Sequence, residues 1–291
     1  MKKIFCRKTL WLLTLGVCAL FAGCDDTDVP TVDTQIVVEG WIDDGGFPMV
    51  FLTQTVTPQT DEQGVERLDS LLIRWAKVSV TDDEGNTVTL SGRTMSNQSL
   101  PFGYTSTDIR GKAGHTYLLT VDYKQYHATA STTIPQAAAV DSFKSVRIAG
   151  NDSLRELHAY VSERAEGAAG YKFLVQRKGK DKYQKSSYLG VYNNAHLASN
   201  PYLTVSVGHT MNIKRFTPMF SVNDTLSVKF ATIDEASYEF WNDYESTVTF
   251  SRNPFFSAGN NIHTNIKGGL GYWCGYGGKS YNVVLKDLEG K

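Results

Sequence analysis

Short β-strand-like runs separated by turns dominate residues 35–134 and constrain the fold more than any other feature. They span residues 35–42, 48–55, 76–81, 87–91, 115–123 and 125–134. The last run alternates strictly, which is the period of a strand with one buried face. Its apolar face holds Tyr126, Ala128, Ala130, Thr132 and Ile134. Short strands at this spacing predict an immunoglobulin-like antiparallel sandwich over residues 35–136, with a hairpin loop at residues 82–86.

The second half predicts another β-rich domain, over residues 137–291, beyond a boundary at residues 135–139. Strand-like runs recur at residues 140–148, 154–161, 171–177, 226–231 and 281–285, with one helix near residues 233–247. Thr232 and Glu235 have the spacing of a capping box at the start of that helix. Its apolar stripe predicts packing on a sheet; the stripe holds Ala236, Phe240, Trp241, Tyr244 and Val248. The predicted fold class is therefore mainly β, in two β-rich domains.

Residues 1–23 have the parts of a bacterial export signal. A basic start precedes an apolar stretch that is shorter than the roughly 20 residues a spanning helix needs, and Ala22-Gly23 stands directly before Cys24. Small residues before a cysteine resemble a lipobox, which predicts cleavage before Cys24 and lipid attachment to its thiol. An ordinary signal peptide cut near Ala22 is the alternative.

Cleavage before Cys24 changes the composition that matters. It removes 23 of the 291 residues and four of the 29 basic side chains, so the mature chain has 268 residues and a formal net charge of −5. Of the four cysteines only Cys24 and Cys274 remain, and a lipidated Cys24 leaves Cys274 without a disulfide partner. With 41% hydrophobic residues the chain is neither disordered nor polytopic, and its charge gives no reason to expect nucleic acid.

Residues 24–34 predict an acidic, solvated tether. An acidic cluster directly after a lipidated cysteine resembles the surface-export signal of Bacteroidota lipoproteins, and this favours the outer membrane with the protein facing the cell exterior. A spacer facing the periplasm is the alternative.

Three segments together resemble a known family: residues 37–42, the helix at residues 232–245, and residues 253–272 with their ending Asn265-Ile266-Lys267-Gly268-Gly269-Leu270-Gly271. They are similar to the Bacteroidota lipoprotein family catalogued as domain of unknown function 4249. The resemblance covers essentially the whole mature chain. It implies an accessory role beside a TonB-dependent outer-membrane transporter, and it implies no catalytic residues. Tyr272-Trp273-Cys274 stands where an aromatic pair without a cysteine is more usual, which indicates that the Cys274 thiol is incidental.

The sequence predicts no catalytic residues, metal site or cofactor. The glycines of residues 268–278 fail the phosphate-loop pattern because Trp273 occupies a glycine position and a strand, not a helix, follows. No histidine has a second ligand at metal spacing, and each is expected to be an exposed strand or loop residue. The six are His115, His127, His158, His196, His209 and His263. The chain is therefore predicted not to be an enzyme, although carboxylates paired in space leave no mark in a sequence.

Tyrosines interleaved with asparagines between residues 181 and 202 form the main candidate contact surface, because this composition is typical of adaptable binding surfaces. The candidate ligand or partner contacts are Tyr183, Tyr188, Tyr192, Asn193, Asn194 and Tyr202. An edge hairpin whose tyrosines lie on a neighbouring sheet is an equal alternative. Residues 96–104 form a second such segment with loop character.

Three tripeptides match the Asp-Ser/Thr-aliphatic pattern of Bacteroidota O-glycosylation, where about one is expected from composition. The candidate acceptors are Ser70, Ser153 and Thr225.

These features predict a non-enzymatic surface lipoprotein that binds an unidentified small ligand and works with a TonB-dependent transporter in nutrient capture. A fimbrial or adhesive β-sandwich subunit, which polymerises by strand exchange, is the alternative. A glycan or peptide hydrolase is a third possibility and predicts a cleft with converging carboxylates or a serine–histidine pair.

Overall fold

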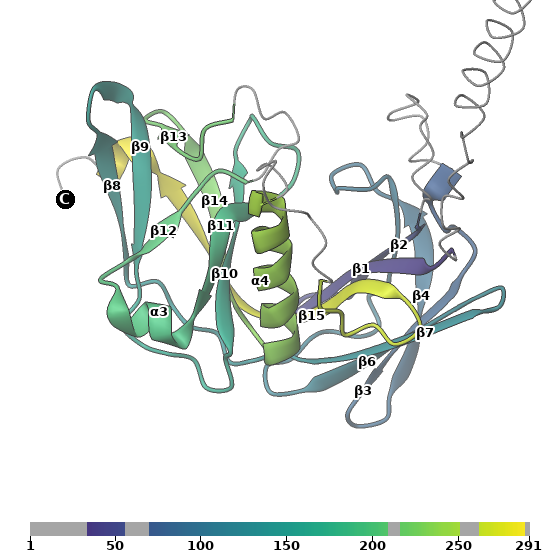
Figure 1. Ribbon diagram of the computed structural model, residues 1–291. Coiled ribbons are helices and arrows are strands. Elements are labelled where there is room, and N and C mark those ends of the chain that lie inside the picture. Colours follow the sequence, from purple (N-terminus) through teal and green to yellow (C-terminus); the bar gives the residue numbers. More distant parts are fainter. Residues whose placement is uncertain (1–33, 56–69, 209–215, 251–261, 289–291) are drawn as a thin grey trace, which may run out of the picture. The chain divides into compact units, whose positions relative to one another are not determined.

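The computed structural model describes residues 34–55, 70–208, 216–250 and 262–288 (Figure 1). The signal sequence, Cys24 and nearly all of the predicted tether lie outside the described residues.

The chain is mainly β, as predicted, with one long helix. The helical elements are α3 (Asn194–Ser199), α4 (Glu235–Phe250) and the 3-10 turn η2 (Leu285–Leu288). The strands are β1 (Ile36–Asp43), β2 (Met49–Gln54), β3 (Lys77–Asp82), β4 (Thr87–Thr94), β5 (Phe102–Thr105), β6 (Thr116–Tyr123), β7 (Tyr126–Thr133), β8 (Ser142–Ile148), β9 (Asn151–Tyr160), β10 (Gly170–Arg177), β11 (Lys185–Asn193), β12 (Leu203–Val205), β13 (Phe220–Ser221), β14 (Thr225–Ile233) and β15 (Leu270–Val284).

Eleven strands form one sheet, in the order β11-β10-β14-β15-β1-β2-β5-β4-β3-β6-β7. Neighbours in it are antiparallel except for β1 and β15, the first and last strands of the chain, which run parallel. Their register places Glu39 beside Tyr272 and Asp43 beside Tyr276. The two ends of the described chain are therefore joined at the middle of the sheet.

The first half of the chain folds into a sandwich because β4 belongs to two layers. Its first residues pair with β3, and residues 91–94 pair with β5. The core between the layers combines Val38 and Val50 from one side with Val78, Leu119 and Ala130 from the other. The fully buried Trp273 of β15 joins this core, and its indole N–H donates to the backbone carbonyl of Tyr117 at 3.0 Å.

The second half places a layer on each face of the large sheet. Strand alternation directs Tyr171, Phe173 and Val175 of β10 to one face, where they pack against the four-stranded sheet of β8, β9, β12 and β13. On the other face Phe240 and Trp241 of α4 pack against Tyr272, Cys274 and Tyr276 of β15. The prediction of one helix packed on a β-sheet is confirmed.

The predicted capping box at the start of this helix is wrong. Thr232 lies inside β14, and its hydroxyl donates to the carbonyl oxygens of Gln136 and Gly277, both at 2.7 Å. Asp234 caps α4 instead, accepting the backbone N–H of Ser237 at 3.0 Å. Its second carboxylate oxygen accepts from Thr132 and from the backbone N–H of Thr133, so the cap also ties α4 to β7.

Two strands differ from the sequence prediction. Residues 102–105 form β5, although Pro101 and Gly103 predict a loop. Residues 281–284 of the expected strand at residues 281–285 are the last part of the 15-residue strand β15, which follows the turn at Gly268, and Leu285 begins η2. The structure thus confirms that the glycine-rich segment is turn and strand. The hairpin at residues 82–86 is also confirmed, with Gly85 at φ +88°.

Up to Ile134 the buried residues of the chain belong to the first core, and from Ala138 the second core begins, on either side of the predicted domain boundary; Ile266 and Trp273 return to the first core. The large sheet nevertheless continues through both halves. The division into domains at residue 136 stays a prediction.

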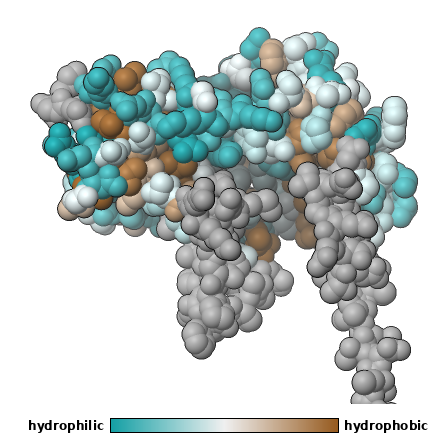
Figure 2. Space-filling model, turned by 90° about the horizontal axis from the view of Figure 1, so that it is seen from above, coloured by the Kyte–Doolittle hydropathy of each residue, from teal (hydrophilic) through white to brown (hydrophobic). Residues whose placement is uncertain are grey.

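The described surface that Figure 2 shows is mixed, with hydrophobic residues in small separate groups among hydrophilic ones. Such a distribution is usual for a face in contact with water. The helices of the described ranges include none with the length and apolar character to cross a membrane.

Close backbone packing explains a glycine in β15 and gives a stability test. Gly271 has φ +98°, and a Cβ there would lie 1.9 Å from the carbonyl oxygen of Val38. Gly85 also has positive φ, but no atom lies within 4 Å of a Cβ at that position. Gly85→Ala therefore introduces only backbone strain of about 1 kcal/mol, whereas Gly271→Ala must also separate β15 from β1.

We expect Gly271→Ala to lower the free energy of unfolding by at least about 2 kcal/mol more than Gly85→Ala, measured by urea denaturation. Equal losses in the two variants would contradict the close approach of β1 and β15.

Candidate functional site

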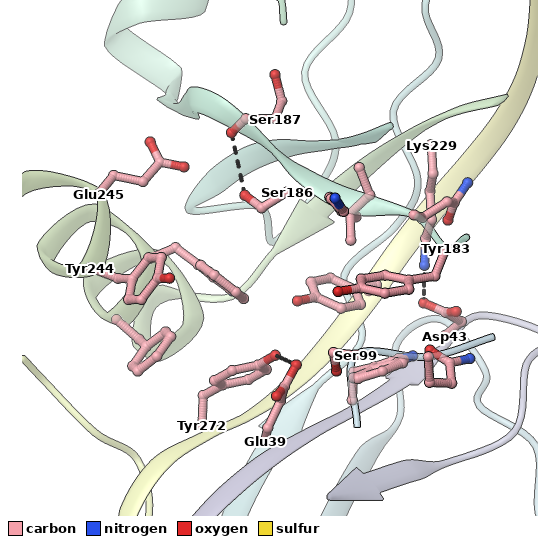
Figure 3. Close-up of a pocket in the computed structure, with 18 of the residues that line it drawn as sticks. Glu39, Asp43, Ser99, Tyr183, Ser186, Ser187, Lys229, Tyr244, Glu245 and Tyr272 are labelled. Atoms are coloured by element: carbon pink, nitrogen blue, oxygen red, sulfur yellow. Dashed lines mark hydrogen bonds and ion pairs between the residues drawn. The ribbon is translucent and has the colours of Figure 1, made fainter. Parts of the chain in front are cut away.

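A cavity of about 630 Å³ lies on the helix-bearing face of the large sheet (Figure 3). β1 and β15 form its floor, α4 one wall, and residues 183–188 at the start of β11 the opposite side. Gln98 and Ser99, from the loop between β4 and β5, complete the rim. Its volume falls within the range of small-molecule sites, which is roughly 300–1,000 Å³.

Strand alternation produces the floor. In β1 the residues Ile36, Val38 and Ile42 face the sandwich core, so Glu39, Trp41 and Asp43 face the cavity. Tyr272 and Tyr276 of β15 lie beside Glu39 and Asp43 in the parallel register. The floor of the cavity, which is part of one face of the large sheet, therefore carries two carboxylates among aromatic rings.

Aromatic side chains line the cavity from both sides. Phe240, Trp241 and Tyr244 come from α4, one helical turn or less apart, and Phe240 lies 4.7 Å from Tyr272 between ring centroids. Tyr183 and Tyr188 face them from the β11 side. In Figure 3, Glu39 and Tyr272, Tyr244, and Tyr183 border the central space from different sides. A concave lining that combines aromatic rings with polar groups is typical of ligand sites.

The two lysines of the cavity are already engaged. Lys229 pairs with Asp43, and its ammonium nitrogen lies 4.9 Å from the ring centroid of Tyr276. Lys185 lies 4.0 Å from a carboxylate oxygen of Asp181 and 5.6 Å from the ring centroid of Tyr183. Lys229 thus has a carboxylate of its own, whereas Lys185 shares Asp181 with Arg177, which binds that carboxylate at 2.9 Å.

Glu39 is the carboxylate of the cavity with no such partner in the described chain. It accepts a hydrogen bond from the Tyr272 hydroxyl at 3.1 Å. Burial raises the pKa of Glu39, while hydrogen bonds from Tyr272 and Ser99 act in the opposite direction. No described lysine, arginine or histidine forms an ion pair with it.

Beneath the wall, a buried ion pair fixes the helix to the sheet. Lys172 of β10 is fully buried, and its ammonium lies 3.3 Å from a carboxylate oxygen of Glu245 and 3.8 Å from the ring centroid of Trp241. Burial lowers the pKa of Lys172 to about 8, opposed by the charge of Glu245. Burial likewise raises the pKa of Glu245, opposed by Lys172. The Lys172 ammonium thus neutralises the charge of Glu245, which lines the cavity.

Nucleophilic or metal chemistry has little support in this part of the molecule. Cys274 is fully buried, and burial raises its thiol pKa to about 12, so the thiolate is not formed at neutral pH. Within the described ranges no group of three or more histidine, cysteine, aspartate or glutamate side chains is placed to hold a metal ion.

Comparison with known families gives a match over residues 25–282, to "Domain of unknown function (DUF4249)". The chain belongs to the DUF4249 family. The comparison with curated proteins finds no match. Among solved structures, a DUF4785 family protein from Legionella pneumophila subsp. pneumophila str. Philadelphia 1 is similar to this DUF4249 chain at 12% identity and a TM-score of 0.23. The similarity covers 70% of this chain and 54% of that one, so it spans about half of that protein.

The structure brings two of the six predicted contact residues, Tyr183 and Tyr188, into the cavity of this DUF4249 protein. Gln98 and Ser99, from the second segment with the same character, line it too. The two segments are far apart in sequence and meet at one site. Tyr188 also packs edge-on against Phe216, with ring centroids 5.0 Å apart.

The other four predicted contacts lie outside this cavity. Tyr192 is buried, and its hydroxyl donates to the carbonyl of Thr204 at 2.6 Å. Asn193 caps α3 through the backbone N–H of His196. Asn194 accepts from the Tyr171 hydroxyl at 2.8 Å. Tyr202 stacks on His158 with ring centroids 3.6 Å apart. All four thus make contacts within the fold, consistent with the alternative of an edge strand with tyrosines on its neighbours.

The candidate glycosylation sites differ in exposure. Ser70 and Ser153 are exposed, whereas Thr225 is half-buried at the start of β14 beside the buried Asp224.

Among the histidines, His158 is buried, contrary to prediction, because it lies between β12 and β8 on the central strand β9. His209 lies outside the described residues.

Sequence reasoning missed Glu39, Asp43, Tyr272 and Tyr276 as site residues. The alternation of β1 carries a usable signal, because its second face holds Glu39, Trp41 and Asp43 where a strand covered on both faces would be apolar. Nothing local signals that β15 supplies the adjacent tyrosines.

The buried pair gives a second stability prediction. Lys172→Met removes the cation and leaves Glu245, whose side chain is 14% exposed, without its ammonium partner. We expect a loss of about 3 kcal/mol in the free energy of unfolding, and recovery of most of it in Lys172→Met/Glu245→Gln. Arg147→Ala breaks an ion pair whose side chains are 68% and 93% exposed, and it should leave the urea midpoint unchanged. A double variant no more stable than Lys172→Met would contradict this coupling.

Proposed function

We propose that this DUF4249 protein is a non-enzymatic, lipid-anchored binding protein of the outer membrane that captures a small ligand for a TonB-dependent transporter. The observation that carries the proposal is the aromatic cavity beside β1 and β15. It has the size, concavity and mixed polar and aromatic lining of a ligand site. The proposed anchor is Cys24, and the acidic tether after it gives the protein reach on the exterior face.

Anchoring and binding support each other physically. A lipid at Cys24 keeps the protein on the membrane surface, so the transporter meets captured ligand at a high effective concentration. Capture and transfer require reversible binding and no bond cleavage. A preformed cavity without a metal cluster or ionised thiol among the described residues suits that task.

Hydrolysis is less well supported by the cavity. The two-carboxylate mechanism of glycoside hydrolysis needs two available carboxyl groups, whereas Asp43 and Glu245 are each paired with a lysine. A serine–histidine pair is also unsupported, because no described histidine lines the cavity.

A fimbrial role would use a strand exchanged between copies of the chain. The candidate strand at residues 281–285 belongs to β15, whose residues 277–284 pair with β14 and whose residues 270–276 pair with β1. Removing β15 would divide the large sheet, so it is a poor candidate for exchange.

The anchor is tested by Cys24→Ser. We expect the wild-type chain to begin at Cys24 and carry lipid, and the variant to keep its first 23 residues and remain free of lipid. Intact mass and incorporation of labelled palmitate measure both. A Cys24→Ser chain still cleaved near Ala22 would establish an ordinary signal peptide and contradict the anchor.

The partner is tested by cross-linking in native membranes followed by purification of this chain. We expect a large outer-membrane barrel to be recovered with wild type and lost with Cys24→Ser, because the uncleaved variant without lipid is not held on the outer membrane. A ladder of cross-linked copies of the chain itself would instead support the fimbrial alternative. Recovery of neither would contradict the transporter partnership.

A further inference from the structure

We propose that the cavity recognises an organic cation, a ligand with a protonated amine or a guanidinium group, and that Glu39 is the carboxylate that binds the positive charge. This inference rests on the proposed binding function of the same cavity and names its ligand class.

The balance of charges is the first argument. Five charged side chains line the cavity: Glu39, Asp43, Lys185, Lys229 and Glu245. Lys229 neutralises Asp43, and Lys172 neutralises Glu245 from below. Lys185 lies 4.0 Å from Asp181, a carboxylate that Arg177 already binds at 2.9 Å, and it forms no ion pair with Glu39. Glu39 remains as one negative charge without a counter-ion in the described chain. A partly buried carboxylate of this kind is costly to the fold unless a ligand supplies the cation.

The surroundings of Glu39 are the second argument. The Tyr272 hydroxyl donates to one of its carboxylate oxygens. Burial raises the pKa of the Tyr244 phenol, and the negative charge of Glu39 acts in the same direction. The Phe240 ring is tilted against Tyr272, with centroids 4.7 Å apart, and stacks on Tyr244 with centroids 6.2 Å apart. A carboxylate surrounded by aromatic rings is the arrangement that holds amines, because ring faces attract cations as the carboxylate does.

The protein's own lysines show that rings of this cavity accept cations. Lys229 and Lys185 lie over Tyr276 and Tyr183, and Lys172 lies over the Trp241 ring from below. The ring faces near Glu39 have no such cation from the described chain. A ligand ammonium placed there would complete the same pattern.

Other ligand classes fit less well. An anion would meet the charge of Glu39, and the Lys229 ammonium is already paired with Asp43. A neutral sugar would stack on the rings but would leave Glu39 uncompensated. We therefore place a cation first and treat neutral and anionic ligands as outcomes of the test.

Three probes of nearly equal size separate the classes: benzylamine, benzyl alcohol and benzoate. They carry a positive, a zero and a negative charge at neutral pH. We expect benzylamine to bind at least about tenfold more tightly than benzyl alcohol, which corresponds to about 1.4 kcal/mol, and benzoate more weakly than either. NMR titration of the purified mature chain measures the three dissociation constants.

Glu39→Gln is the decisive variant, because it keeps the shape and an acceptor for Tyr272 and removes the charge. It should bring the affinity for benzylamine down to that for benzyl alcohol. Glu84→Gln is the matched control: it changes the net charge equally, at an exposed hairpin residue, and should leave all three affinities unchanged. Because burial raises the pKa of Glu39, its ionised form costs folding energy. The melting temperature of Glu39→Gln should therefore equal or exceed that of wild type, which a purely structural role would not allow.

The pH dependence has a defined sign. Binding of the amine needs ionised Glu39, and a raised pKa means that this residue takes up its proton at a higher pH than the ordinary value of 4.5. Affinity for benzylamine should thus fall on acidification with a midpoint above pH 4.5 in wild type and stay flat in Glu39→Gln. The other titratable groups around Glu39 are Tyr244 on α4, Tyr272 and Tyr276 on β15, and the paired Asp43–Lys229 and Lys172–Glu245.

The outcomes distinguish this inference from the binding function on which it rests. If benzyl alcohol or benzoate binds as tightly as benzylamine, and Tyr244→Ala weakens that binding, the cavity binds ligands but the cation assignment is wrong. If Glu39→Gln keeps the affinity for benzylamine, the role of Glu39 is wrong. If no probe binds, both the cation assignment and the proposed binding role of the cavity are contradicted.

Discussion

The parallel pairing of β1 with β15 is the contact on which the rest of the structure depends. One face of β15 supplies Trp273 to the first core and Val283 to the second, and the opposite face supplies Tyr272, Cys274 and Tyr276 to the layer under α4. A single strand thus serves all three buried clusters. The approach to β1 is so close that Gly271 has no room for a side chain. The glycines that resemble a phosphate loop in the sequence are therefore packing residues.

The same pairing builds the floor of the cavity. In a parallel register each residue of β1 has a fixed neighbour on β15, so Glu39 lies beside Tyr272 and Asp43 beside Tyr276. Burying two carboxylates among aromatic rings costs free energy. Asp43 is stabilised by Lys229, and Glu245 across the cavity by Lys172, whereas Glu39 receives only neutral donors. A site residue that costs stability in the free protein is expected where function, and not folding, selects the side chain.

The sequence predicts those parts of the fold in which local pattern and burial agree. The strands of the sandwich follow from alternation, and the helix near residue 240 follows from its apolar stripe. The prediction fails where distant contacts override local preference. β5 forms although Pro101 and Gly103 disfavour a strand, because β2 and β4 pair with it on both edges. The composition of residues 181–202 identified Tyr183 and Tyr188 as contact residues. The hydrogen bond between Tyr272 and Glu39 joins residues 233 positions apart, so no local sequence pattern predicts it.

The cavity also lies where the two halves of the described chain meet. Glu39 belongs to a strand of the sandwich core, whereas Tyr244 and Tyr183 belong to elements that pack with the second half. A ligand that touches all of them would bind only when both halves are folded, and would stabilise them together by an amount that grows with the ratio of its concentration to its dissociation constant. A cation at Glu39 would add the charge that this carboxylate lacks, so the stabilisation by ligand would be largest at the residue that is least stabilised by the fold. The same few side chains of β1, β15 and α4 would then contribute both to ligand binding and to the stability of the fold.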